Sequence, residues 1–333
     1  MSGATTAGRR SPARGRGPLA AGALVVAALL VLSLAVGGYD ITARTMLEDP
    51  AAREMFLISR VPRTAALVLA AAAMGVSGVV MQVLVQNRFV EPTTTGAGAW
   101  AALGVVVLAL GYPAAPTLVR MACATAFAFA GTVVFLGVLR GVSLRSSVVV
   151  PLVGIMLGAV VSSATLFLAN SADLLQMLAT WRSGGFSGVV RGQYEPLWIV
   201  AVVVLAVYLT ADRFTVAGLG RDVSTGLGLD HRRVVLTGTA MVALATGVTT
   251  VVVGMLPFLG LVVPNVVALL RGDDVRRNLP WVLLGSVALV LVCDLIGRTV
   301  VAPLEVPASV VLGAVGATCF VALVLHRRRW LRV

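Results

Sequence analysis

The sequence contains no lysine, because all 26 of its basic residues are arginine. The P-loop of ATP-hydrolysing proteins needs a lysine that reaches the nucleotide phosphates, so the chain does not hydrolyse ATP by that route. Its two histidines and three cysteines are scattered, and none of them has the spacing of metal ligands. No serine, histidine and acid form a recognisable catalytic set. We therefore expect no enzyme activity, no metal and no cofactor.

Charged residues are also scarce, at 12% of the chain, whereas 59% of the residues are hydrophobic. Soluble domains are about 45–50% apolar, and a membrane helix needs about 20 consecutive apolar residues. Ten segments meet or approach that length, namely 19–37, 62–85, 94–111, 116–138, 147–169, 194–210, 233–254, 257–270, 279–300 and 306–325. We predict an all-α polytopic membrane protein with about ten transmembrane helices. The short segment 257–270 leaves nine or eleven spans open, because such a length is also typical of re-entrant segments.

The few charges are unevenly placed between the two sides of these spans. With ten spans and a cytoplasmic N-terminus, 18 of the 26 arginines but only six of the 14 acidic residues lie inside. This agrees with the positive-inside rule and predicts that both termini are cytoplasmic. We expect basic tails at 1–18 and 327–333 around a transmembrane domain at 19–326. The topology accounts for the basic composition, and no basic stripe with interleaved aromatics indicates nucleic-acid binding.

Ionisable residues within the spans are rare. Asp294 and Arg298 are four residues apart, so they share a helix face and can pair. A transporter that is driven by an ion gradient needs several such residues in mid-span. An ion-coupled secondary transporter is therefore the less favoured alternative to a permease that a partner protein drives.

Several motifs occur in a characteristic order and spacing. They are RVPRT, SGVVMQVLVQNRFVEPTTTGAGAWAALG, FLGLVVPNVVALLRGDDVRRNLP and CDLIGRTVVAPLEVPASVVLGAVGATCF, followed by a basic C-terminus. Together they resemble the permease family of binding-protein-dependent ABC importers for iron-siderophores, haem and vitamin B12. The resemblance implies the type II ABC importer permease fold in the cytoplasmic membrane of a prokaryote. It also implies three kinds of partner: a second permease subunit, two ATPase subunits and an extracytoplasmic substrate-binding lipoprotein.

The same resemblance ranks the substrates. The motifs look closest to ferric siderophore permeases of the catecholate and petrobactin branch. Much of the family has His where Asn265 stands and often Arg where Ala268 stands, which argues against a haem or cobalamin permease, although both remain alternatives. A bulky ferric chelate needs a wide path with weak contacts. The residues expected to line it are Gln82, Thr93, Thr94, Thr95, Gly96 and Asn265, and helix packing by small residues is the alternative for Thr93 to Gly98.

Three arginines are expected at the outer mouth of the bundle. Arg60 and Arg63 share one helical face, and Arg298 lies at the outer end of a later span. By the resemblance they match family arginines that grip acidic residues of the binding protein, and a guanidinium can bind a carboxylate with two hydrogen bonds. Contact with lipid headgroups is the alternative.

One inner loop, at about 217–233, matches the position of the family's coupling helices, which seat in a groove of the ATPase. The residues expected to carry this contact are Gly218, Gly220, Arg221, Ser224, Gly226, Leu227 and Gly228. An ordinary solvated loop is the alternative. Family members commonly have an Ala-containing segment where Ser224 and Thr225 stand in this chain.

Overall fold

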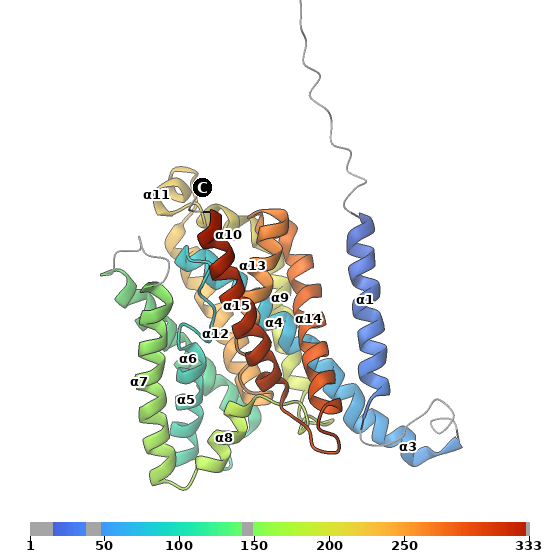
Figure 1. Ribbon diagram of the computed structural model, residues 1–333. Helices are drawn as coiled ribbons and strands as arrows, with labels where there is room; N and C mark the ends of the chain where they lie inside the picture. Colours follow the sequence, from blue (N-terminus) through green and yellow to red (C-terminus); the bar gives the residue numbers. More distant parts are fainter. Residues whose placement is uncertain (1–15, 38–47, 142–148, 331–333) are drawn as a thin grey trace, which may run out of the picture.

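The computed structural model describes residues 16–37, 48–141 and 149–330, and its regular elements in these ranges are all helices (Figure 1). Each of the ten predicted spans coincides with one main helix. These are α1 (Arg16–Ala35), α4 (Val61–Val85), α5 (Ala97–Gly111), α6 (Thr117–Leu139), α7 (Val149–Ser171), α9 (Trp198–Leu209), α12 (His231–Val252), α13 (Leu259–Arg271), α14 (Val275–Thr299) and α15 (Ala308–Trp330). The shorter elements are α3 (Pro50–Met55), η2 (Phe56–Arg60), α8 (Leu175–Ser183), η3 (Glu195–Leu197), α10 (Ala211–Ala217) and α11 (Arg221–Gly226).

These helices differ in their ability to cross a membrane alone. In the described ranges, six helical segments are long and apolar enough, and the pair α9 and α10, bent by 61°, makes a seventh. The apolar helices α5 and α13 and the apolar part of α15 are shorter. This count is compatible with about ten spans and confirms the predicted all-α polytopic fold.

The centre of the bundle is α4, which continues α3 and the π-helical turn η2 without a break. It packs against α14, α12, α13 and α9. In the most apolar stretch of this continuous helix 72% of the residues are buried, whereas in that of α1 only 11% are buried. Helix α1 lies at the edge of the bundle, beside α14 (Figure 1). On the other side, α5 packs against α6, α7 and α12. Helix α4 is therefore the core element on which both groups of helices are assembled.

Close backbone contact between α4 and α13 depends on small residues. A Cβ atom added to Gly78 would lie 2.0 Å from the carbonyl oxygen of Gly260. Without side chains at this point the two backbones can touch, as is common in membrane helix pairs. Helix α13 has 13 residues, or about 20 Å at 1.5 Å per residue, so it is shorter than the roughly 30 Å of a bilayer core. It is therefore too short to cross the bilayer core alone, and it begins inside the bundle, against α4.

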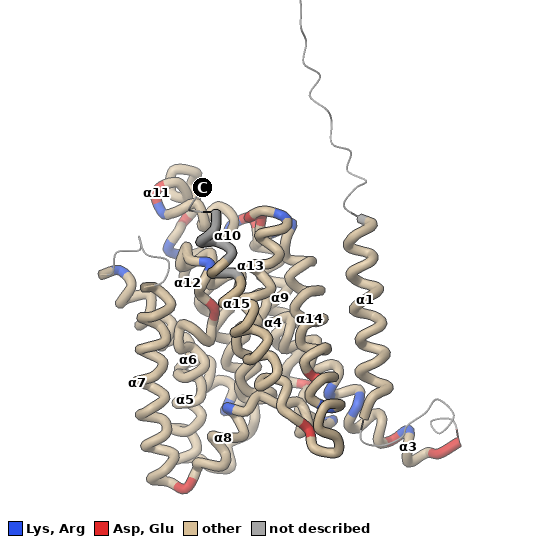
Figure 2. The backbone as a smooth tube through the Cα atoms, in the orientation of Figure 1, with Lys and Arg blue, Asp and Glu red and all other residues tan. Residues whose placement is uncertain are grey.

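The bundle has two distinguishable ends. At the α11 end, α1 starts and α15 finishes, and at the opposite α3 end lie α3, α8 and the connection between α14 and α15 (Figure 1). Figure 2 shows that charged residues are concentrated toward these two ends. That distribution is expected of helices whose middle sections lie in hydrocarbon. The two predicted basic tails fall largely outside the described residues, so their placement stays a prediction.

Candidate functional site

A cluster of charged side chains lies at the α3 end, where α4 and α14 meet. Asp294 contacts two guanidinium groups: its Oδ1 accepts a hydrogen bond from Arg63 Nη2 at 2.9 Å, and its Oδ2 forms an ion pair with Arg298 Nη2 at 2.6 Å. Arg63 also pairs with Glu305, at 2.9 Å. The side chain of Asp294 is only 2% exposed, and those of Arg298 and Arg63 are 5% and 13% exposed. The cluster is therefore an internal network of charges.

The predicted docking arginines also hold the end of α1. Arg60 donates through Nη1 to the carbonyl oxygens of Leu34 and Ala35, at 2.9 and 2.8 Å. Arg298 donates to the carbonyl of Val36 at 2.8 Å and to the hydroxyl of Ser33 at 2.9 Å. The last carbonyls of a helix have no partner within it, and they carry partial negative charge that favours cations. The two arginines thus fasten the end of α1 to α4 and α14.

The sequence pattern predicted that Arg60 and Arg63 share one face, but they have different partners in the structure. Arg60 ends the π-helical turn η2, in which the helix is wider than in α4. Its guanidinium binds α1, whereas Arg63 binds α14 and the loop after it. The anchoring of α1 had no signal in the sequence, because its acceptors are backbone carbonyls and the hydroxyl of Ser33.

Glu305 completes the cluster from the loop that precedes α15. It accepts a hydrogen bond from the hydroxyl of Ser187 and pairs with Arg63. Burial raises the pKa of Glu305, but the Ser187 hydroxyl and the Arg63 guanidinium lower it by more, so this pKa lies below its ordinary value of 4.5. The carboxylate therefore remains charged while it links two loops at the α3 end.

A second polar site lies where the connection between α4 and α5 meets the start of α13. Glu91 is 0% exposed, and its Oε1 accepts a hydrogen bond from the backbone N–H of Phe258 at 2.7 Å. The hydroxyl of Thr93 also donates to it. A carboxylate at a helix N-terminus is stabilised by the free N–H groups and by the helix dipole. Glu91 therefore ties this connection to the short helix α13.

Sequence reasoning did not select Glu91. Ten spans with a cytoplasmic N-terminus place this residue among the six acidic residues on the inner side, and the structure buries it completely. The available signal was an acidic residue followed by Pro92 between two apolar spans. Such a carboxylate needs hydrogen-bond partners when it is buried, and only the fold shows that α13 supplies one.

The six predicted path residues surround this same connection. Gln82 donates to the carbonyl of Gly260 at 3.1 Å, and Asn265 donates to the carbonyls of Arg88 and Leu261, both at 2.7 Å. The hydroxyls of Thr94 and Thr95 bond to backbone carbonyls within the connection, and Gly96 lies against Gly158 of α7. Thr93 and Thr94 are half-buried, as is Gln82, and the other three are buried. All six residues thus lie in or against the connection between α4 and α5, which is called the connector below. Their hydrogen bonds are largely to backbone atoms.

The predicted coupling residues lie at the α11 end, in α11 and the turns on either side of it (Figure 1). Ser224 is fully buried, and its hydroxyl lies 3.0 Å from both the Arg221 carbonyl and His231 Nδ1. Leu219, Val223 and Leu227 are 61%, 50% and 66% exposed. The segment is therefore a folded helical turn. The buried hydroxyl of Ser224 holds it to the start of α12, and its apolar side chains are exposed.

Two of its glycines differ in their surroundings. Gly228 has a φ of +81°, which side chains other than glycine adopt at a cost, whereas Gly226 has no such φ. A Cβ on either of them would have no atom within 4 Å. Of these two, Gly228 is therefore the one that the backbone conformation requires.

Metal binding finds no support among the residues that the structure describes, since none of their His, Cys, Asp and Glu side chains form a group of three that could hold an ion.

Comparison with known proteins gives a consistent result. The model of the FecCD transport family matches residues 24–326. The chain is 48% identical to the petrobactin import system permease protein FatD of Bacillus anthracis, over 92% of this chain and 90% of that protein. It is 39% identical to the ferric-anguibactin transport system permease protein FatD of Vibrio anguillarum, over 81% and 86%.

A solved structure described as a metal-chelate type ABC transporter in an inward-facing conformation has the same fold. Its TM-score is 0.75 at 21% identity, over 92% of this chain and 98% of that one. The sequence match extends over nearly the whole helical bundle. The chain therefore belongs to the FecCD transport family, a family of ABC transporter permease subunits.

Proposed function

We propose that this multi-pass membrane protein is the permease subunit of an ABC importer that moves a ferric siderophore across the cytoplasmic membrane. The observation that carries the proposal is the sequence similarity to two import permeases. The chain is 48% identical to the permease for petrobactin over 92% of its length, and 39% identical to the permease for ferric anguibactin over 81%. A haem or cobalamin substrate within the same family is the alternative. An ion-coupled carrier is disfavoured because the buried carboxylates of Glu91 and Asp294 are held by a helix N-terminus and by two arginines.

Energy for transport would come from two separate ATPase subunits, since a chain without lysine cannot supply a P-loop lysine. The segment from Gly218 to Gly228 suits this contact because it is folded and exposes Leu219, Val223 and Leu227. Apolar side chains at the centre of a protein interface are typical of such contacts. A movement of the ATPase would reach α12 through the contact between Ser224 and His231, the first residue of that helix.

The substrate path would run beside the connector between α4 and α5. Short, discontinuous helices such as α13 and irregular connections between helices mark substrate sites in many transporters. In this proposal Thr93 and Thr94 are the half-buried members that contact the chelate, while Gln82 and Asn265 fix the connector from behind. A second permease subunit would complete the path.

Docking of a substrate-binding lipoprotein would take place at the α3 end. For Arg60 and Arg298 to grip carboxylates of that partner they would have to release the end of α1. Arg63 is the best placed of the three, because its partner Glu305 lies in a loop and is 34% exposed. We therefore propose Arg63 as the main docking arginine, with Arg60 and Arg298 supporting the surface.

Both chain termini would be cytoplasmic, with the α11 end inside. Cysteines introduced at Ser2 and Val333 of a chain without its three native cysteines should resist impermeant thiol reagents in intact cells. A cysteine at Gly188, an exposed position in the connection between α8 and α9, should react. Labelling of either terminus from outside would overturn this orientation.

The proposed function is tested by uptake into vesicles. The chain would be reconstituted with its ATPase and binding protein, and accumulation of ferric petrobactin, haem and cobalamin would be measured with and without ATP. We expect accumulation of the ferric siderophore that depends on ATP and on the binding protein. Uptake by the chain alone along a proton or sodium gradient would refute the proposal, and ATP-driven uptake of only haem or cobalamin would refute the substrate.

A further inference from the structure

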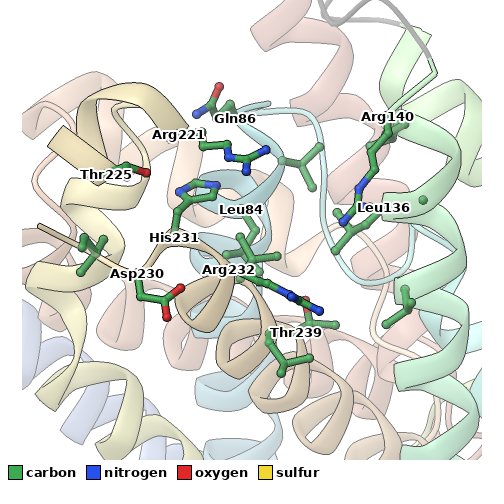
Figure 3. A pocket seen from close by; sticks show the side chains of 17 residues that line it. Leu84, Gln86, Leu136, Arg140, Arg221, Thr225, Asp230, His231, Arg232 and Thr239 are labelled. Atoms are coloured by element: carbon green, nitrogen blue, oxygen red, sulfur yellow. The ribbon is translucent and has the colours of Figure 1, made fainter.

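A large cavity opens at the α11 end, between the end of α6 and the start of α12, with α11 beside it (Figure 3). Its volume is about 1270 Å³. Its walls include the apolar side chains of Leu84, Leu136 and Leu236. Its polar lining includes three arginines, each from a different element. The cavity is therefore apolar on one side and strongly basic on the other.

The basic side carries charge without a matching acid. Arg140 at the end of α6, Arg221 of α11 and Arg232 of α12 extend their guanidinium groups toward the same space (Figure 3). No carboxylate of the described part of the chain forms an ion pair with any of the three. Asp230, the acidic residue in the lining, pairs with Arg233 at 2.8 Å and caps its backbone N–H. Three converging cations repel one another, so this space favours an anion.

The position of Arg232 strengthens that preference. It lies in the first turn of α12, where the helix dipole places partial positive charge and disfavours a cation. A guanidinium presents paired N–H donors that match the oxygens of a phosphate group. The arrangement is thus suited to a phosphate rather than to a small halide.

The apolar side of the cavity continues along the membrane-facing surface of the bundle. On α6, Val133 in the cavity wall is 45% exposed, and on α12, Leu236 is 54% exposed. A second hollow of about 530 Å³ lies along the same two helices and is lined by Phe129 and Ala240, among others. Phe129 is one helical turn from Val133, and Ala240 directly follows Thr239 of the first cavity. The two hollows lie one after the other along α6 and α12, and they are together called the groove.

We propose that this groove binds an anionic phospholipid, with its phosphate between Arg140, Arg221 and Arg232 and its acyl chain along α6 and α12. Basic pockets between membrane helices are suited to anionic lipid headgroups. A free phosphate would use the arginines but not the apolar groove, whereas a lipid uses both. The inference goes beyond the proposed function because it needs neither a siderophore nor an ATPase. It makes the lipid a bridge between the bundle and α11.

The test measures lipid binding to the purified full-length chain by native mass spectrometry. Phosphatidylglycerol would be titrated against phosphatidylcholine with the same acyl chains. The variant Arg140→Gln/Arg232→Gln removes two cavity arginines and leaves Arg221 in place. Its phosphatidylglycerol affinity should fall by about 30-fold, from the usual contribution of each basic residue near an anionic lipid surface. Phosphatidylcholine should bind weakly to both proteins.

The matched control is Arg233→Gln, which removes the same charge from the neighbouring position. Arg233 is paired with Asp230 and is absent from the cavity lining, so this variant should bind phosphatidylglycerol like the wild type. Equal losses in Arg233→Gln and in the double variant would reduce the effect to general surface charge and overturn the proposal. Unchanged phosphatidylglycerol binding in the double variant would also overturn it.

A second arm separates a lipid from free phosphate. Glycerol 3-phosphate and inorganic phosphate carry the headgroup chemistry without acyl chains. If the apolar groove contributes, neither should displace phosphatidylglycerol at equal concentration. The variant Leu236→Gln changes the groove but keeps all three arginines. It should bind phosphatidylglycerol more weakly than the wild type does. Displacement by inorganic phosphate at equal concentration would show an anion site that does not take a lipid, and would refute the proposal.

Discussion

Replacement of Asp294 by asparagine tests the buried charge cluster at the α3 end. The carboxylate pairs with both Arg63 and Arg298, and its side chain is 2% exposed. Asparagine has nearly the same shape but no charge, so Arg63 would keep only Glu305 as an ion-pair partner, and Arg298 would keep only its neutral acceptors on α1. Removal of one partner from a buried ion pair typically costs about 3–5 kcal/mol. We expect a loss of this size in the stability of the purified chain.

The assay is thermal unfolding in detergent, with Asp212→Asn as the matched control. Asp212 pairs with Arg276 on the surface, where the two side chains are 66% and 55% exposed. Exposed pairs contribute about 0–1 kcal/mol, so the control should unfold close to the wild type. At roughly 2 °C per kcal/mol for a chain of this size, Asp294→Asn should lower Tm by about 6–10 °C.

A second readout follows the anchoring of α1. Without Asp294 the orientation of Arg298 is less restrained, and its bonds to Val36 and Ser33 should weaken. Hydrogen exchange in the last turn of α1 should therefore increase in the variant and not in the control. Equal Tm values for the two variants would refute the reasoning, since they would show that burial adds nothing to the strength of this pair.

Three further predictions concern other parts of the chain. Gly228→Val should uncouple ATP hydrolysis from uptake in the reconstituted system, because a side chain at φ +81° costs about 1–3 kcal/mol. Gly228→Asn should remain more strongly coupled, because asparagine tolerates a positive φ better than valine does; equal coupling in the two variants would contradict this. Arg63→Gln should weaken docking of the binding protein by up to about fivefold in a salt-dependent way, and Arg60→Gln by less; unchanged docking in Arg63→Gln would argue against its role. The lowered pKa of Glu305 means that its stabilising effect is present above pH 4.5 and is lost as the pH falls below that value. Melting temperatures should therefore differ between wild type and Glu305→Gln at neutral pH and converge in acid, and a constant difference would contradict this.

The sequence by itself determined the class of fold and the position of the helices. Runs of apolar residues predict membrane helices because each residue contributes its own transfer free energy, almost independently of its neighbours in space. All ten predicted spans contain a helix, and the short span 257–270 contains the 13-residue helix α13. The order of the motifs likewise indicates the permease family.

Only the tertiary structure decided what the polar residues contact. Glu91 and Phe258 are far apart in the sequence, yet the N-terminus of α13 receives this carboxylate. Arg60 and Arg298 had the pattern of exposed docking residues, whereas the fold directs them to the carbonyls of α1. Hydrogen bonds and ion pairs depend on distances of about 3 Å between groups from different helices. A linear pattern can place a charge at the end of a helix, but the packing of the helices determines which partner that charge meets.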